Sequence, residues 1–80
     1  MDHASPYPDE AIRTLLGIEA VPEEIRGQLE HSAGGTYTVR CTALQAAVQA
    51  LPEEARHSMS EEQLVVLMLG VAAAGEADPS

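Results

Sequence analysis

The sequence predicts an all-α protein, a small bundle-like domain of four or five helices. Its 80 residues include thirteen Ala and eight Leu but no Phe or Trp, and Ala and Leu side chains lose little rotamer freedom in a helix. Apolar residues recur three and four positions apart in several segments, which is the spacing of one helix face. The tripeptide Pro-Glu-Glu occurs twice and is typical of a helix start.

The first helix is expected over residues 9–16, after an extended arm of residues 1–8 that contains two prolines. Ile12 and Leu15 lie three positions apart and would face the core. Gly17 follows the last apolar residue, and glycine commonly ends a helix.

A second helix is expected to start at Pro22, because proline suits the first turn of a helix. The two glutamates that follow it would stabilise the positive end of the helix dipole. Ile25 and Leu29 lie four positions apart and would face the core. The glycine pair at 34–35 predicts the end of this helix.

The segment 36–51 fits two structures. Residues 36–42 alternate polar and apolar side chains, as a half-buried strand would. The same segment also carries apolar residues at spacings of 4, 3, 4 and 3, which predicts a helix: Tyr37, Cys41, Leu44, Val48 and Leu51. We favour the helix, because no second strand pattern exists elsewhere for a lone strand to pair with.

Two more helices are expected in the last third of the chain. Pro52 opens a short helical piece that ends near Ser58. A longer helix follows, with Ser60 as its N-cap and Gln63 three residues later, which together make a capping box. We expect this helix to reach about Ala74. The domain would then cover residues 9–75, with a short loose tail over residues 76–80.

The formal net charge of −9 limits the classes of partner. Nucleic-acid binding needs a basic patch, and anionic lipid surfaces repel an acidic protein. Residues 1–11 lack the basic start of a signal peptide, and the longest apolar run, residues 64–74, is too short to cross a bilayer. We therefore expect a cytoplasmic protein that binds neither nucleic acid nor a membrane.

The acidic residues themselves have a local explanation. Eight of the thirteen acids fall in the first turn of an expected helix, where a negative charge stabilises the helix dipole: Asp9, Glu10, Glu23, Glu24, Glu53, Glu54, Glu61 and Glu62. An inhibitor that mimics nucleic acid would instead carry its acids along one continuous face.

The single cysteine, Cys41, excludes an internal disulfide and falls in the apolar stripe of the third helix. We expect a buried and unreactive thiol there, because a cysteine in apolar surroundings behaves as a small hydrophobe.

Two His-Ser pairs, His31-Ser32 and His57-Ser58, place a base next to a hydroxyl in the sequence. Adjacent residues of a helix point about 100° apart, so the two side chains do not face each other. No aspartate lies near either pair in the sequence to orient the histidine. We therefore predict no catalytic residues.

No metal or nucleotide motif is visible. His3, His31, Cys41 and His57 follow one another at intervals of 28, 10 and 16 residues, unlike the ligand spacing of structural zinc sites. The glycine pair at 34–35 lacks the motif of a phosphate-binding loop. We predict no metal, no cofactor and no small-molecule substrate.

The last helix is unusual because residues 64–74 contain no polar side chain. A helix that is apolar all round must be covered on every side, either by its own domain or by a partner. Leu64, Leu67, Met68 and Val71 form one stripe that would face the core. The candidates for partner contact are Val65, Val66 and Leu69 outside this stripe, with Met68 as an adaptable contact at its edge.

From these features the sequence predicts a non-enzymatic protein–protein interaction module, such as an adaptor, a docking subunit or a regulatory subunit. Its partner would be another protein or a second copy of the chain, which would form a homodimer through the last helix. The alternatives are a small acidic inhibitor that occupies a basic surface, or an accessory subunit of an enzyme complex.

Overall fold

The structure is a computed structural model that describes residues 5–76, and this stretch contains five α-helices and no strand. The helices, which are joined by short connections, are α1 (Tyr7–Leu16), α2 (Glu23–Ser32), α3 (Tyr37–Ala50), α4 (Glu53–His57) and α5 (Glu61–Glu76). The all-α class is therefore confirmed. Much of the expected N-terminal arm (residues 1–4) and of the tail (residues 77–80) lies outside the described residues.

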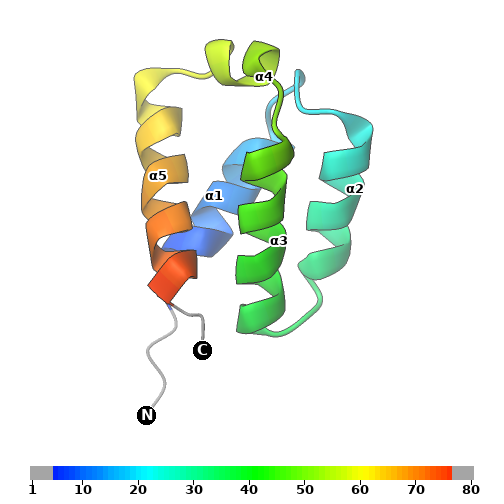
Figure 1. The fold of residues 1–80 in the computed structure, drawn as a ribbon, viewed down its shortest axis with the longest axis vertical. Helices are drawn as coiled ribbons and strands as arrows, with labels where there is room; N and C mark the ends of the chain where they lie inside the picture. Colours follow the sequence, from blue (N-terminus) through cyan, green and yellow to red (C-terminus); the bar gives the residue numbers. More distant parts are fainter. Residues whose placement is uncertain (1–4, 77–80) are drawn as a thin grey trace.

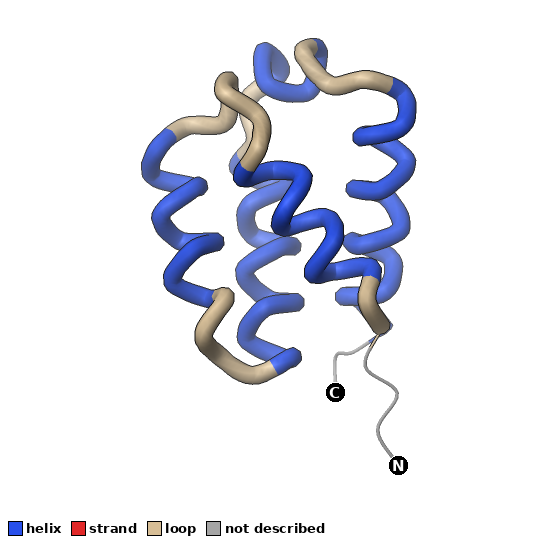
Figure 2. Tube along the Cα trace, turned by 180° about the vertical axis from the view of Figure 1, so that it is seen from behind, coloured by secondary structure: helices blue, strands red, loops and turns tan. Residues whose placement is uncertain are grey.

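Three helices lie side by side with α3 in the middle, and α1 crosses them from behind (Figure 1). Seen from that side, α1 runs diagonally across α3 (Figure 2). Helix α1 contacts α5, α3 and α2, while α3 contacts both α5 and α2. The short helix α4 connects the top of α3 to the top of α5 (Figure 1). The four longer helices thus enclose one core.

The core is aliphatic and draws on every helix. Leu15, Leu29 and Leu44, from α1, α2 and α3, are fully buried. Two residues of the connection between α1 and α2, Ile18 and Val21, are also buried. Because these two side chains are buried, the connection is part of the core. A fully buried isoleucine or valine side chain contributes about 1.5–3 kcal/mol to stability.

Helix α1 begins at Tyr7, two residues before the start expected from the sequence. Pro8 lies in the first turn of the helix and is buried, because proline is tolerated there and its ring packs on the core. The amide of Ser5 donates a hydrogen bond of 3.1 Å to the Tyr37 hydroxyl on α3. Ser5 is therefore bonded to α3, and Tyr7 and Pro8, which were expected in the extended arm, belong to α1.

The segment that fitted both a strand and a helix is the helix α3. Thr36 is its N-cap, and the Thr36 Oγ1 accepts a hydrogen bond from the Val39 amide. Cys41 and Leu44 are buried, as is Leu51 directly after the helix, so these members of the predicted stripe face the core. The other two members, Tyr37 and Val48, are half-buried and pack against it.

The start of α5 is the best-predicted detail of the fold. The Ser60 amide donates to Gln63 Oε1 at 2.9 Å, and the Gln63 amide donates to Ser60 Oγ at 3.2 Å. These reciprocal bonds are the expected capping box. The helix continues to Glu76, slightly beyond its expected end near Ala74.

A glycine lets α5 approach α1 closely. A Cβ atom at Gly70 would overlap the Ala11 Cβ and lie 3.0 Å from the Tyr7 carbonyl oxygen and 3.2 Å from Leu44 Cδ2. Tyr7 and Ala11 belong to α1, so only a residue without a side chain fits at this helix crossing. The contact positions α5 against the first half of α1.

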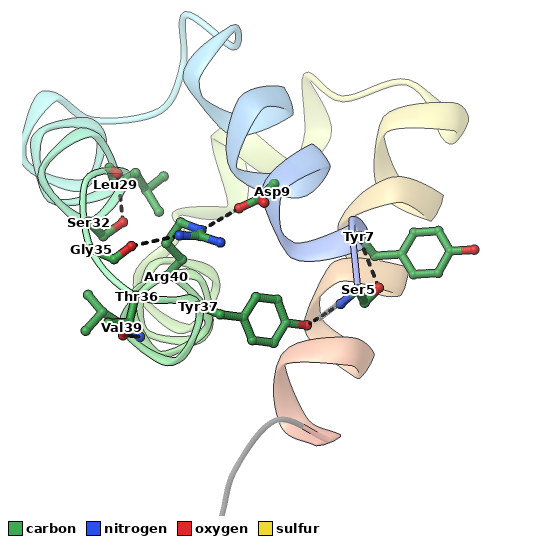
Figure 3. A network of polar contacts seen from close by, with 10 residues as sticks. All are labelled: Ser5, Tyr7, Asp9, Leu29, Ser32, Gly35, Thr36, Tyr37, Val39 and Arg40. Atoms are coloured by element: carbon green, nitrogen blue, oxygen red, sulfur yellow. Dashed lines mark hydrogen bonds and ion pairs between the residues drawn. The ribbon is translucent and has the colours of Figure 1, made fainter. Parts of the chain in front are cut away.

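Two arginines fix connections between helices. The Nη2 of Arg26 on α2 donates a hydrogen bond of 2.7 Å to the carbonyl oxygen of Ile18 in the α1–α2 connection. Arg40 on α3 donates from Nε to Asp9 Oδ1 on α1 and from Nη1 to the Gly35 carbonyl oxygen, both at 2.7 Å (Figure 3). Both guanidinium groups therefore have structural partners.

Candidate functional site

The inner side of α5 is narrow and consists of small residues together with one leucine. Leu67, Gly70 and Ala74 are the buried residues of this helix. They lie three and four positions apart, so they form one continuous line toward α1 and α3. The remaining residues of the uncharged run 63–75 lie to the sides of this line or on the outside of the helix.

The outer side of α5 carries large apolar side chains. Val65 is 54% exposed, Met68 70% and Leu69 44%. Ala72 is exposed as well, and the four positions follow the i, i+3, i+4, i+7 spacing of one helix face. We call these four residues, Val65, Met68, Leu69 and Ala72, the α5 ridge.

One of the expected partner contacts of α5 needs correction. Met68 was expected both in the apolar stripe and as a partner contact, and its side chain is mostly exposed. Val66 was placed among the partner contacts, but it is half-buried and packs against the core. The core approaches α5 from the side of Gly70 and Ala74, which turns Val66 inward and Met68 outward.

An apolar groove runs beside the α5 ridge. It has a volume of about 460 Å³ and is lined by residues of α3, α4 and α5: Val48, Arg56, Leu64, Leu67, Met68, Val71 and Ala72. Six of these seven residues are apolar, and Arg56 is the exception. Met68 and Ala72 belong to both the groove and the α5 ridge, so the two form one continuous apolar surface.

A second hollow, of about 480 Å³, lies near the ends of α1 and α4 and is lined by more polar residues: Gly17, Ile18, Glu19, Ala20, Ser58 and Gln63. Glu19 is the one titratable residue of this lining. The Ser58 hydroxyl donates a hydrogen bond of 2.8 Å to the Ala55 carbonyl oxygen and so stabilises the end of α4. The arrangement brings no acid–base pair together.

Cys41 is buried at 3% exposure, as the sequence predicted. Burial raises the pKa of the Cys41 thiol above its usual value, because the thiolate would lose its hydration. A raised pKa keeps the thiol protonated at neutral pH, and the protonated form is a poor nucleophile. The residue packs the core.

The two His-Ser pairs lie at the ends of helices. His31 is in the last turn of α2 and His57 in the last turn of α4, and both are exposed. The Ser32 hydroxyl is buried and donates 2.8 Å to the Leu29 carbonyl oxygen, as Ser58 does in α4. Each serine hydroxyl thus bonds the backbone of its own helix.

Neither a metal cluster nor a membrane span is found within residues 5–76. No group of three or more His, Cys, Asp or Glu side chains in this part of the chain is arranged to hold a metal ion. None of the five helices is both long enough and apolar enough to cross a bilayer.

The eight acidic residues that were expected in the first turns of helices are found there. Helices α1, α2, α4 and α5 each carry two acidic residues in the first turn. Near the helix N-terminus such charges are stabilising, typically by about 0.3–1 kcal/mol each at the surface. Much of the negative charge therefore belongs to the helix ends.

Comparison of the chain with protein-family models, with curated proteins and with solved structures gave no match.

Proposed function

We propose that this protein is a non-enzymatic protein–protein interaction module, an adaptor, docking subunit or regulatory subunit, that binds its partner through the α5 ridge. The observation that carries the proposal is the exposure of Val65, Met68 and Leu69 on one side of one helix. Contiguous apolar surface of this kind marks interaction sites in soluble proteins, whereas single exposed apolar residues need no explanation.

The rest of the surface provides the contrast. Among the described residues, the other large exposed apolar side chains are Tyr7 on α1 and Val39 on α3. They belong to different helices, whereas the α5 ridge presents three within five positions. Complete burial of a Val, Leu or Met side chain contributes about 1.5–3 kcal/mol, and the ridge residues are roughly half exposed. A partner that covers them would gain several kcal/mol from these residues alone, by the same estimate.

The groove beside the ridge favours a particular mode of binding. A partner helix can place its apolar face in an apolar groove, with anchors spaced at i, i+3, i+4 and i+7. The groove of about 460 Å³ could take such anchors, while Met68 forms its outer wall. Methionine adapts its shape to different neighbours, which suits a residue at a binding surface.

We place this module in the cytoplasm as part of the proposal, since its free cysteine is buried and unpaired, as is common in reducing compartments.

The proposal can be tested by site-specific photo-crosslinking in cells. A photoreactive amino acid replaces Met68 in one variant and Val39 in another, because both positions are exposed and apolar but lie on different helices. We expect a discrete protein adduct at position 68 that disappears when Leu69→Glu is added, and none at position 39. Equal labelling at the two positions, or no adduct at 68, would contradict the proposal.

A further inference from the structure

The α5 ridge has an acidic residue at each end. Glu61 precedes Val65 by four positions, and Glu76 follows Ala72 by four. On a helix this spacing puts the acids on the same side as the ridge, and both are exposed. With a rise of about 1.5 Å per residue, the two positions are about 22 Å apart.

Nothing charged lies between these two ends. Residues 63–75 contain no Asp, Glu, Lys or Arg, and Glu62 adds a second exposed acid at the first end. Helix α5 has no basic residue in its last turn, so the negative end of its dipole reinforces the charge of Glu76. At the other end the two glutamates outweigh the positive end of the dipole, which is equivalent to only about half a charge. The surface is therefore an apolar centre between two negative ends.

This charge pattern disfavours a second copy of the chain as the occupant. If two α5 helices packed antiparallel, Glu61 of one would approach Glu76 of the other, and if they packed parallel, like residues would meet. Each copy would also bring a net charge of −9. Both arrangements place negative charge against negative charge beside the apolar contact.

Arg56 is the one basic residue that lines the apolar groove, and it belongs to α4 and not to α5. Val48 of α3 also lines this groove. Within residues 5–76 its guanidinium takes part in no ion pair. The acids available to a cation of the partner are the exposed Glu61 and Glu62 at the start of α5 and Glu76 at its end.

We propose that the partner of the α5 ridge is a helix of another protein that has an apolar face and a basic residue near each end, about 22 Å apart. The inference rests on the proposed function, and it adds the chemistry of the partner. The apolar face would bury Val65, Met68 and Leu69, while the basic ends would pair with Glu61 and Glu76. Charge pairing of this kind contributes to specificity and to the rate of association.

The test uses three synthetic fluorescent peptides of one length and the full-length protein. The first is an amphipathic helix with leucines at i, i+3, i+4, i+7 and i+11 and two lysines at each end. The second has glutamates in place of the lysines, and the third keeps the lysines but scrambles the order of the central residues. Binding is measured by fluorescence anisotropy at low and at high salt.

We expect the lysine-ended helix to bind at least about tenfold more tightly than the glutamate-ended one at low salt. High salt should reduce this preference, because exposed charges are screened. Glu61→Gln combined with Glu76→Gln should reduce it too. Met68→Gln should weaken binding of the first peptide, whereas the matched exposed control Val39→Thr should leave it unchanged.

The other outcomes separate the two proposals. If both helical peptides bind equally and both need Met68, the charge inference is wrong but the interaction surface stands. Concentration-dependent dimerisation abolished by Met68→Gln would likewise overturn the charge inference alone and identify a second copy as the occupant. Binding of the scrambled peptide as tight as that of the first, or no binding by any peptide together with a monomer at all concentrations, would overturn both.

Discussion

The two sides of α5 differ in a way that reverses the usual order of a surface helix. Its inner side presents Gly70 and Ala74 to α1 and α3, and its outer side presents Val65, Met68 and Leu69 to the surroundings. In an ordinary amphipathic helix the large apolar residues are buried and small or polar residues lie outside. Here the close helix packing uses Gly70 and Ala74 next to Leu67, and three of the larger residues, Val65, Met68 and Leu69, remain exposed.

This comparison teaches that apolar character alone does not identify the core side of a helix. Helix α5 lies close to α1 because Gly70 has no side chain. A Cβ atom at this position would collide with the Ala11 Cβ and the Tyr7 carbonyl oxygen. A helix that packs so closely against another must carry small residues at the point of contact.

The largest effect is expected from a pair of leucines two positions apart. Leu67→Ala should lower the free energy of unfolding by about 2–5 kcal/mol, because it leaves a cavity in the core. Leu69→Ala should lower it by less than about 1 kcal/mol, since Leu69 is already partly exposed. Urea unfolding followed by circular dichroism measures both. Similar losses for the two variants would show that α5 is covered on both sides within the domain.

A glycine pair tests the close approach of α5 to α1. Gly70→Val should destabilise the fold by about 1–3 kcal/mol, because the added side chain collides with Ala11 and with the backbone at Tyr7. Gly27→Ala in α2 is the matched control, since no atom lies within 4 Å of the added Cβ there. That variant should stabilise the helix by about 0.5–1 kcal/mol. The midpoints of thermal unfolding should shift in opposite directions, and a neutral Gly70→Val would refute the packing argument.

Both sides of α5 depend on the helix starting correctly. Ser60→Ala removes the acceptor for the Gln63 amide and should cost about 1 kcal/mol. Ser58→Ala is a suitable comparison, because Ser58 Oγ bonds a carbonyl at the end of α4 and does not cap α5. Hydrogen exchange of the first-turn amides of α5 should accelerate in Ser60→Ala alone. Unchanged exchange in that variant would contradict the role of the capping box.

The smallest expected effect on the free energy of unfolding is confined to alkaline pH and concerns Cys41, a buried residue of α3. Burial raises the pKa of the Cys41 thiol above its usual value, so the folded state holds this proton more tightly than the unfolded state. Its contribution to stability is fully present below about pH 9 and is lost as the pH rises through the folded pKa. The free energy of unfolding of Cys41→Ala should therefore fall less steeply above pH 9 than that of the parent chain. Equal slopes in denaturant titrations at several pH values would contradict this.

Helix boundaries were the most predictable part of the fold, because their signals are local. The Ser60–Gln63 box, which the sequence predicted, depends on two residues three positions apart. The choice of helix over strand for α3 also followed from its own stripe, in which Cys41 and Leu44 face the core. The start of α1 was expected at residue 9, but the helix begins at Tyr7 and includes Pro8 in its first turn.

The orientation of α5 was only partly predictable. Its uncharged run, residues 63–75, has no polar side to show which residues point outward. Val65, Met68 and Leu69 were expected as partner contacts and are exposed, whereas Val66, which was expected among them, is half-buried and packs against the core. Only the position of α1 shows which side is inner, and the sequence around Gly70 does not reveal its nearest neighbour.

The two arginine contacts that join different parts of the fold had no signal in the sequence. Arg40 pairs with Asp9, 31 positions away, and Arg26 reaches a carbonyl oxygen of the preceding connection. Such pairs depend on how the helices are placed in space, which no local spacing encodes.

The crossing of α1 and α5 has a consequence for the synthesis of the chain. Gly70 is made nearly sixty residues after Ala11, so at about 5–20 residues per second α1 waits several seconds for the helix that covers it. Until then the inner face of α1 has only α2 and α3 to pack against. The packing of α5 on α1 is therefore among the last helix contacts that the growing chain can make.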